Sequence, residues 1–348
     1  MFKEFQYKDI DDGKIHGENI LIDVRSPYEY KNATIPGAIN IPIFNDEERK
    51  TIGTIYVQES VEKAKRIGIG VASKKLPDIY DKVANLNKEY DHLIFFCAKG
   101  GFRSTSVASL FSSIGINAFK IDGGYKKYRK YINNALPKTV ENIKFVVLYG
   151  NTGTGKTHIL EEIEKMGPDI LDLEACANHR GSLLGSVGLG EQNSQKQFES
   201  LLYESLKNRK SNLVFVEGES KRIGKVIIPN YIYNAMNNGI HIKIEANMEY
   251  RVNNIMKDYV HETDDELISS LNLLRKYMGN RKIDNYIDLI NENKYEEVIE
   301  ELMVKYYDPR YENNNRDIGA VFYNENSKDA AREIVTFIKK LLQCEKQR

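Results

Sequence analysis

The chain has 348 residues, which suggests two domains, each long enough to bury its own core. Fifty basic residues balance fifty acidic ones, so net charge indicates no special partner and any nucleic-acid site must be a local patch. Three cysteines are too few for a disulfide framework. The sequence starts without an apolar signal core and has no run of membrane-spanning length, so we expect a cytoplasmic protein that does not insert into membranes.

Short apolar strands alternate with helical segments in the first half. We expect strands over 20–24, within 34–42, and over 93–96 and 118–121. Ser26 is a suitable N-cap for a short helix after the first strand, and a further helix is predicted over 105–113. This alternation predicts a parallel α/β sheet.

Cys97 ends the apolar strand 93–96 and is followed by a glycine-containing loop, residues 98–104. Backbone N–H groups converge on such a loop, and Lys99 and Arg103 add positive charge, so we expect the sulfur to be stabilised as a thiolate. A thiolate of this kind can accept a sulfur or selenium atom. Most cysteines are simply small apolar side chains, but the loop favours the reactive interpretation.

Basic and aromatic residues are interleaved after the last of these strands. The basic ones are Lys126, Lys127, Arg129 and Lys130. This composition suits phosphate contact and base stacking in RNA, and an amphipathic helix with a solvated face explains it equally well. Pro137 is expected to stop this helix, so we predict a first domain over 1–137 and a second domain over 138–348.

The strongest motif in the chain lies between an apolar strand (145–149) and a helix (156–166). It reads Gly150-Asn151-Thr152-Gly153-Thr154-Gly155-Lys156-Thr157. The spacing G-x-x-x-x-G-K-T in this setting predicts a phosphate-binding loop, because glycines let backbone N–H groups turn inward at a helix N-terminus. Lys156 is expected to clamp the outer phosphates and Thr157 to bind a magnesium ion. His158 excludes a dinucleotide fold, since it stands where a third glycine is required.

Two further features point to a phosphorylated ligand. Arg180 begins a loop rich in glycine, which could close over the ligand so that Arg180 touches phosphate oxygens. Glu217 ends the buried strand 213–216, where phosphate-loop proteins place the carboxylate that holds the metal through water, and Glu219 competes for that role.

The remaining features of the second half have plainer interpretations. A second basic cluster contains Lys221, Arg222 and Lys225, and either contact with phosphate groups, including those of RNA, or solvation explains it. From residue 248 to 307 the pattern is helical, with Leu267 and Leu271 at core spacing, which usually means packing. The asparagine-rich piece 312–316 is interpreted as a loop before a last strand and helix.

These motifs resemble a known family. Segments 23–30, 35–42, 97–103 and 122–125 resemble a rhodanese domain. A rhodanese domain followed by a phosphate-binding-loop domain resembles the tRNA 2-selenouridine synthases, and segments 66–70, 179–185 and 216–224 are similar to that family's signatures. The resemblance thins after about residue 255. Ala98-Lys99 stand where the family commonly has Trp-Arg, and Gly218 stands where an acidic residue is usual.

The resemblance implies a transferase that converts the wobble 2-thiouridine of tRNA to 2-selenouridine. In the family, geranyl diphosphate first geranylates the sulfur and selenophosphate then supplies selenium. Residues 150–157 would hold the diphosphate, and Cys97 would take part in selenation. Alternatives from other classes are an ATP-dependent kinase or ATPase with a rhodanese docking or sulfurtransferase domain, a simple thiosulfate sulfurtransferase, and a non-catalytic binding protein.

Overall fold

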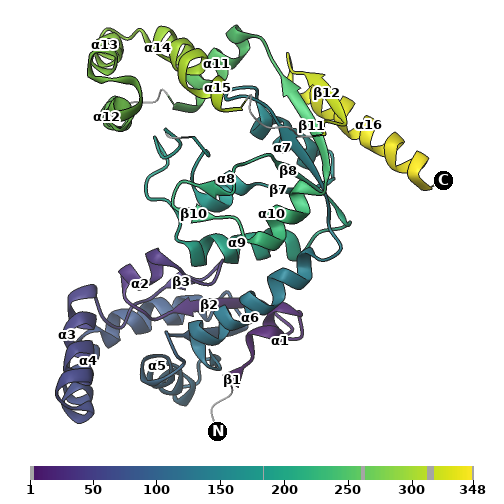
Figure 1. Ribbon diagram of the computed structural model, residues 1–348. Helices are drawn as coiled ribbons and strands as arrows, with labels where there is room; N and C mark the ends of the chain where they lie inside the picture. The colour runs from purple at the N-terminus through teal and green to yellow at the C-terminus, as the bar shows by residue number, and fades with distance from the viewer. Residues whose placement is uncertain (1–3, 183, 260–262, 312–316, 347–348) are drawn as a thin grey trace. The chain divides into compact units, whose positions relative to one another are not determined.

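The computed structural model describes residues 4–182, 184–259, 263–311 and 317–346, and the chain divides into two compact units. The first unit is Met1–Leu136 with Glu199–Leu201, and the second is Pro137–Phe198 with Leu202–Arg348. Each contains a parallel sheet flanked by helices (Figure 1), so the α/β fold class predicted from the sequence is confirmed. The asparagine-rich piece 312–316 lies outside the described residues.

The first unit is built on a parallel sheet with the strand order β1-β5-β4-β2-β3. Its strands are β1 (Glu4–Phe5), β2 (Asn19–Asp23), β3 (Ile39–Asn40), β4 (His92–Phe96) and β5 (Ala118–Ile121). Four consecutive residues of β4, from Leu93 to Phe96, are fully buried, as expected for a parallel strand covered on both faces. The carboxyl ends of such strands are where α/β sheets bind ligands, and Cys97 directly follows β4.

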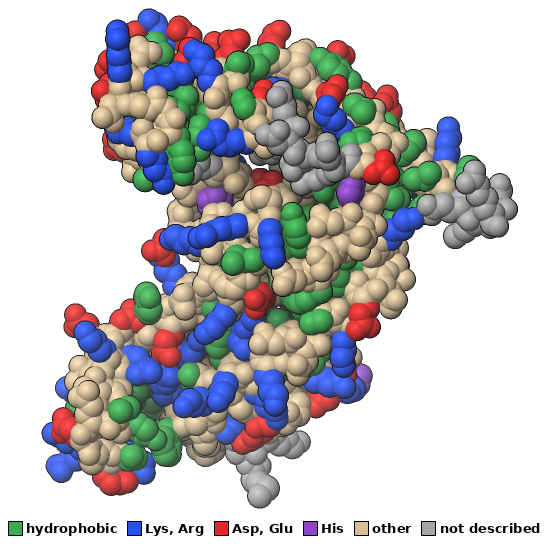
Figure 2. Space-filling view, in the orientation of Figure 1, with side chains coloured by type: hydrophobic (Ala, Val, Ile, Leu, Met, Phe, Trp, Pro, Cys, Tyr) green, Lys and Arg blue, Asp and Glu red, His purple; other side chains and the backbone are tan. Residues whose placement is uncertain are grey.

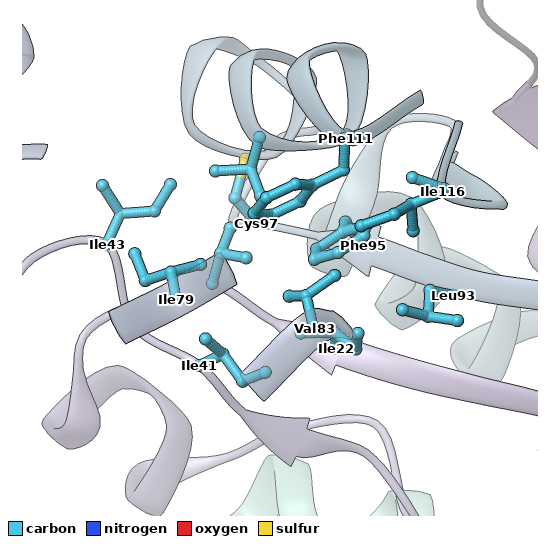
Figure 3. Close-up of a cluster of buried hydrophobic side chains, with 14 of the residues drawn as sticks. Ile22, Ile41, Ile43, Ile79, Val83, Leu93, Phe95, Cys97, Phe111 and Ile116 are labelled. Carbon is cyan, nitrogen blue, oxygen red and sulfur yellow. The ribbon is translucent and has the colours of Figure 1, made fainter. Parts of the chain in front are cut away.

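Helices enclose this sheet. They are α1 (Tyr7–Asp11), α2 (Pro27–Asn32), α3 (Asp46–Gln58), α4 (Val61–Leu86), α5 (Phe102–Ser113) and α6 (Gly124–Val140). Ser26 caps α2 through a capping box with Glu29, as its sequence position predicts. The core packs between the sheet and helices α4 and α5, where Val83, Phe95 and Phe111 meet (Figure 3).

The prediction that Pro137 stops its helix is wrong. Pro137 lies inside α6, which continues to Val140. Proline removes one N–H from the helical hydrogen bonds, but Leu136 and Val140 on either side are buried. Packing of this face therefore outweighs the lost bond. The domain division after residue 137 stays a prediction.

The second unit also has a parallel sheet, with the order β12-β11-β6-β8-β7. Its strands are β6 (Lys144–Tyr149), β7 (Asp169–Leu171), β8 (Leu213–Glu217), β11 (Ile240–Glu245) and β12 (Ala320–Tyr323), and β9 (Arg222–Ile223) and β10 (Val226–Ile227) form a separate hairpin. β6 pairs with β8 so that Leu148 lies opposite Glu217. The phosphate-binding loop and Glu217 therefore leave neighbouring strands at the same edge.

Two groups of helices complete this unit. They are α7 (Lys156–Lys165), α8 (Leu173–Ala177), α9 (Gln195–Lys207), α10 (Asn230–Asn237), α11 (Met248–Tyr259), α12 (Asp264–Met278), α13 (Asn280–Asn291), α14 (Tyr295–Leu302), the π-helix η1 (Met303–Tyr307), α15 (Asp308–Tyr311) and α16 (Ser327–Lys346). α7 and α16 pack on the sheet, whereas α11 to α15 gather at one end (Figure 1) around a second apolar core. None of the helices in the described ranges is long and apolar enough to cross a membrane.

Candidate functional site

Cys97 belongs to the buried core of the first unit. Its side chain is only 3% exposed, and in Figure 3 its sulfur lies next to the helix that carries Phe111. The hydroxyl of Ser104 donates a hydrogen bond to Sγ at 3.2 Å, and the thiol can donate to the carbonyl of Gly101 at 3.8 Å. The polar contacts of the sulfur thus come from its own loop and the first turn of α5. A reactant can reach the sulfur only if this loop moves locally.

The Cys97 loop is fixed by the start of α6. The N–H groups of Tyr125 and Lys126 donate to the carbonyls of Cys97 and Ala98, each at 2.9 Å. A Cβ atom at Gly124 would lie 2.2 Å from the carbonyl oxygen of Cys97, so this close approach requires glycine there. The Asp-Gly-Gly motif of the sequence therefore supports the loop from the neighbouring strand end.

Lys120 is a buried cation under the same loop that sequence reasoning missed. Its ammonium group donates to the carbonyl of Gly100 and to the hydroxyl of Thr105, each at 3.0 Å, and pairs with Glu4 at 2.9 Å. In the sequence Lys120 is only one polar residue within a short strand. Its role depends on the tertiary fold.

The two cations predicted around Cys97 have different environments. Arg103 donates to both carboxylate oxygens of Glu29, at 2.6 and 3.3 Å, so its charge is neutralised by an ion pair. Burial acts to raise the pKa of Glu29, but the Arg103 guanidinium outweighs it and the pKa is lowered. Lys99 is exposed on the loop.

The basic residues of α6 also differ in how exposed they are. Lys126, Lys127 and Lys130 are exposed, and Lys127 pairs with Asp122. Arg129 is partly buried and donates to Asn133 at 3.1 Å. Basic and acidic side chains are intermixed on the face drawn in Figure 2. RNA contact through α6 stays a prediction.

The phosphate-binding loop, residues 150–157, joins β6 to α7 as predicted from the motif. Gly153 and Gly155 both have φ near +80°, which favours glycine. The ammonium group of Lys156 donates to the loop carbonyls of Gly150 at 2.9 Å and Asn151 at 3.3 Å. Lys156, Thr157 and Arg180 line one polar cavity.

Three side chains far away in sequence hold this loop in place. Arg251 donates to the carbonyl of Thr152 at 2.9 Å, Asn254 to that of Gly153 at 2.9 Å, and Asn324 to that of Thr154 at 2.8 Å. Arg251 is itself fixed by an ion pair with Asp308 at 2.6 Å. Local sequence gave no signal for these anchors, since they occur in helical or loop segments of ordinary composition.

Three carboxylates face the loop. Ligand oxygens of Glu174, Glu217 and Glu219 all lie within 4.8 Å of one another, and Glu174 and Glu219 line the polar cavity. Glu217 is fully buried, and neither of its oxygens has a hydrogen-bond partner among the described residues. Thr157 lies close enough to Glu217 to act to lower its pKa, although its hydroxyl forms no hydrogen bond with this carboxylate in the structure.

The proximity of these carboxylates changes their ionisation. Burial, with Asp172 and Glu219 nearby, raises the pKa of Glu217 to about 8, against the opposing effects of Thr157 and Lys156. Burial and the other two carboxylates also raise the pKa of Glu174 well above its usual value. Glu174 was not among the predicted site residues. The oxygen-rich group formed by Glu174, Glu217 and Glu219 is suited to a divalent cation.

Glycines bring other chain segments close to this group. A Cβ atom at Gly181 would lie 2.4 Å from an oxygen of Glu219, so the glycine-rich loop passes directly over the carboxylates. A Cβ atom at Gly218 would lie 2.1 Å from the ring of Tyr149, which leaves no room for a side chain at this position.

The cationic residues predicted in the second unit lie at two different sites, the polar cavity and the β9–β10 hairpin. Arg180 stacks on the ring of Tyr259 at 4.9 Å, donates to the carbonyl of Val187 at 2.8 Å and lines the polar cavity. Lys221 and Arg222 are exposed at the β9–β10 hairpin and are not among the lining residues of that cavity.

A second cavity adjoins the first. It lies inside the helical part of this unit, and most of its lining is apolar. Thr152, Ser182, Ile255 and Tyr259 line both cavities. Leu267 and Leu271, whose spacing indicated packing, lie in its wall.

Comparisons with known proteins agree with both units. A family model described as the tRNA 2-selenouridine synthase AAA domain matches residues 143–342, and a rhodanese-like domain model matches residues 4–131. A tRNA 2-selenouridine synthase of Nitrosomonas europaea is 36% identical over 70% of this chain, and the chain spans only 64% of that protein. One of Pseudomonas syringae pv. tomato is 31% identical over 84% of this chain and 87% of that protein. Among solved structures, a rhodanese-related protein from Thermoplasma volcanium is 18% identical over 37% of this chain and 93% of that chain, with a TM-score of 0.22.

Proposed function

Because this chain belongs to the tRNA 2-selenouridine synthase family, we propose that it replaces the sulfur of a wobble 2-thiouridine in tRNA with selenium. Geranyl diphosphate and selenophosphate are the proposed co-substrates. The observation that carries the proposal is the polar cavity in which Lys156, Thr157 and Arg180 converge at a phosphate-binding loop. We also propose that the protein is cytoplasmic, as predicted from the sequence.

The first step is transfer of the geranyl group to sulfur. The thiouridine sulfur forms a bond to the allylic carbon of the donor, the carbon–oxygen bond breaks, and diphosphate leaves with the electron pair while the base loses its N3 proton. Loop N–H groups, Lys156 and Arg180 would stabilise the charge that builds on the diphosphate. Lys156 must then release the carbonyls of Gly150 and Asn151 that it now contacts.

The magnesium ion that the phosphate-loop fold implies fits the residues present. Glu217 has two buried oxygens without a hydrogen-bond partner among the residues that the structure describes, and Thr157 and Lys156 lie near it. Thr157 and Glu217 would hold the ion, with Glu174 and Glu219 close by. When bound, the ion supplies positive charge that stabilises the leaving diphosphate.

The second step is selenation in which Cys97 takes part. Geranylation turns the sulfur into a thioether, which is a better leaving group than a thione. A carbon–selenium bond then forms at the ring carbon, the carbon–sulfur bond breaks, geranylthiol leaves, and hydrolysis releases the phosphate of selenophosphate. The hydroxyl of Ser104 would stabilise an anion on the Cys97 sulfur. Movement of the exposed part of the loop would admit the reactant.

Mass spectrometry of tRNA nucleosides from cells expressing variants tests this assignment. We expect Lys156→Ala to abolish geranylation and Cys97→Ser to abolish selenation. Lys165→Ala and Cys344→Ser, at exposed positions, are the matched controls and should leave both products unchanged. Unchanged 2-selenouridine in both site variants would refute the proposal. ATP turnover by the purified protein without tRNA, together with no geranyl diphosphate binding, would favour the kinase or ATPase alternative.

A further inference from the structure

Two aromatic side chains of the first unit are unusually exposed. Tyr28 is 70% exposed and Phe102 is 64% exposed, the highest values for any aromatic ring among the side chains that the structure describes. Phe102 is also the only phenylalanine among those side chains that is exposed. Single apolar side chains on a surface are normal in themselves. The question is therefore where these two rings lie.

Both rings lie beside the Cys97 loop. Tyr28 directly precedes Glu29, Phe102 directly precedes Arg103, and an ion pair of 2.6 Å joins Glu29 to Arg103. Phe102 is also the first residue of α5, which begins where the loop ends. The fold thus brings rings from two distant segments next to one ion pair at the loop that carries the reactive sulfur.

The backbone under both rings is held in place. Glu29 accepts hydrogen bonds from Arg103 through both carboxylate oxygens and also pairs with Arg49 of α3 at 3.4 Å. The backbone N–H of Tyr28 donates to Asp46 at 3.0 Å. Because the segments that carry the rings are already ordered, a ligand that stacks on them pays little for immobilising them.

Positively charged side chains accompany the rings. The ammonium group of Lys65 lies 5.2 Å from the centre of the Phe102 ring, and it also pairs with the exposed Glu62 at 3.1 Å. Lys99 is exposed on the loop itself. Aromatic rings next to cations are the composition of sites for single-stranded nucleic acid, where bases stack on the rings and cations contact phosphates.

The chemistry proposed for Cys97 also favours RNA as the occupant. Selenation changes a ring carbon of a nucleobase, so an unpaired base has to come to the Cys97 loop. Unpaired bases of RNA are recognised by stacking on aromatic side chains. Interfaces between proteins are instead depleted of lysine, whereas Lys65 and Lys99 lie beside these rings.

We propose that Phe102 and Tyr28 stack on unpaired bases of the tRNA substrate while Lys99 contacts an adjoining phosphate. This assignment rests on the proposed function and adds to it the residues that hold RNA at the Cys97 loop. Stacking on one ring contributes about 5- to 150-fold to affinity. One phosphate contact contributes about 0.7 to the slope of log affinity against log salt concentration.

Titration of a fluorescently labelled anticodon stem-loop containing 2-thiouridine with the full chain, at several salt concentrations, measures both contributions. We expect Phe102→Ala and Tyr28→Ala each to weaken binding at least about fivefold without changing the salt slope, since neither side chain is charged. Lys99→Ala should instead make the slope shallower by about 0.7. Tyr323→Ala, which removes a 51% exposed ring from β12 of the second unit, is the matched control and should bind like the wild type.

Conservative variants separate stacking from plain apolar contact. Phe102→Tyr keeps a ring and should keep wild-type affinity, whereas Phe102→Leu keeps only apolar bulk and should lose affinity as Phe102→Ala does. Melting temperatures should be equal in all these proteins, because the substituted side chains are exposed.

Photocrosslinking of the wild type gives a direct readout that does not depend on any variant folding. 5-Iodouridine is placed at one position of the anticodon loop at a time, and long-wavelength ultraviolet light joins it to an aromatic ring stacked on it. Peptide mass spectrometry should then find the crosslink on Phe102 or Tyr28.

Equal affinity of the wild type, Phe102→Ala and Tyr28→Ala, with crosslinks only at other residues, would overturn the proposal and make a protein partner the better occupant of these rings. So would full affinity in Phe102→Leu, because the ring would then supply only apolar contact. An assay of selenation of the geranylated stem-loop distinguishes the two failures. Product formation with unchanged binding in the ring variants sinks only the stacking assignment, whereas ring-dependent binding without product in the wild type sinks only the proposed function.

Discussion

The hydroxyl of Ser104 donates a hydrogen bond of 3.2 Å to the sulfur of Cys97, and both side chains are almost fully buried. A hydroxyl stabilises a sulfur anion more than a neutral thiol, because charge-assisted hydrogen bonds are roughly twice as strong as neutral ones. The neutral thiol can also donate to the carbonyl of Gly101, which the anion cannot do. Of these two contacts, only the one from Ser104 serves the reactive form.

Ser104→Ala is therefore expected to slow reactions through the Cys97 anion by at least about tenfold, since a hydrogen bond to a charged group contributes about 1.5–3 kcal/mol. The measurement is the rate of iodoacetamide alkylation at Cys97, followed by peptide mass spectrometry, with exposed Cys344 as internal reference. Ser113→Ala at the far end of α5 is the control. Equal alkylation rates in all three proteins would show that Ser104 has no electrostatic role.

The ion pair between Glu29 and Arg103 should make stability depend on acid pH. Arg103 lowers the pKa of Glu29 in the folded chain, so its stabilisation is present above the unfolded-state pKa and is lost as pH falls through the lower folded-state value. Glu29→Gln is expected to cost about 1 kcal/mol at pH 7, a value discounted for the partial exposure of the pair. The cost should shrink below about pH 4.

Denaturant unfolding of the full chain at pH 7 and pH 3.5 measures this difference. Glu62→Gln removes an exposed partner of Lys65 on α4 and should have no effect at either pH. A cost for Glu29→Gln that is the same at both pH values would mean that the charge of Glu29 does not stabilise the folded chain.

Local motifs in the sequence were sufficient for most of the fold. The strands before Cys97 and Gly150 are short apolar runs, and each loop follows its strand directly, so neighbours in sequence define both features. Ser26 and Glu29 form a capping box at the spacing that predicts one. The phosphate-binding loop needs glycines at fixed offsets, which are visible without any structure.

Residues that act through tertiary contact could not be predicted in this way. Asn324 is 170 positions from its partner Thr154, and Lys120 reaches the Cys97 loop from an adjacent strand. Glu174 joins Glu217 only because α8 follows a strand that pairs with β8. Pro137 was misinterpreted for the same reason, since the packing that keeps α6 helical is not local.

Glu217 should make the second unit less stable as pH rises. With a pKa near 8 when folded and near 4.3 when unfolded, this carboxyl holds a proton in the folded chain that the unfolded chain has released between these values. Stability therefore falls through this window, with the opposite sign to Glu29. Glu217→Gln is expected to reduce this slope and to raise the melting temperature at pH 8.

Thermal unfolding at pH 5.5 and pH 8.5, with and without magnesium, tests this expectation. Magnesium should raise the melting temperature of the wild type at the higher pH, because it binds only the folded state, and should do so less in the variant. Glu325→Gln, at an exposed glutamate, is the control. A wild type and a Glu217→Gln variant with parallel pH profiles would contradict the assigned ionisation.

The ring of Tyr149 excludes a side chain from position 218. A Cβ atom there would lie 2.1 Å from the ring, and Tyr149 is held edge-on against His241 at 5.2 Å. Gly218→Ala is expected to destabilise the chain by about 1–3 kcal/mol through overpacking. Gly70→Ala is the control, since no atom lies within 4 Å of its Cβ inside helix α4, and it should stabilise by about 0.5–1 kcal/mol.

A double-mutant cycle isolates the ring as the cause. In a Tyr149→Ala background the space at position 218 is open, so Gly218→Ala should cost much less there than in the wild type, as measured by denaturant unfolding of all four proteins. The same cost in both backgrounds would show that backbone freedom, and not the ring, is what glycine supplies. If the ring is the cause, carboxylates at this strand end must come from Glu217 and Glu219 on either side of Gly218, which is where the structure has them.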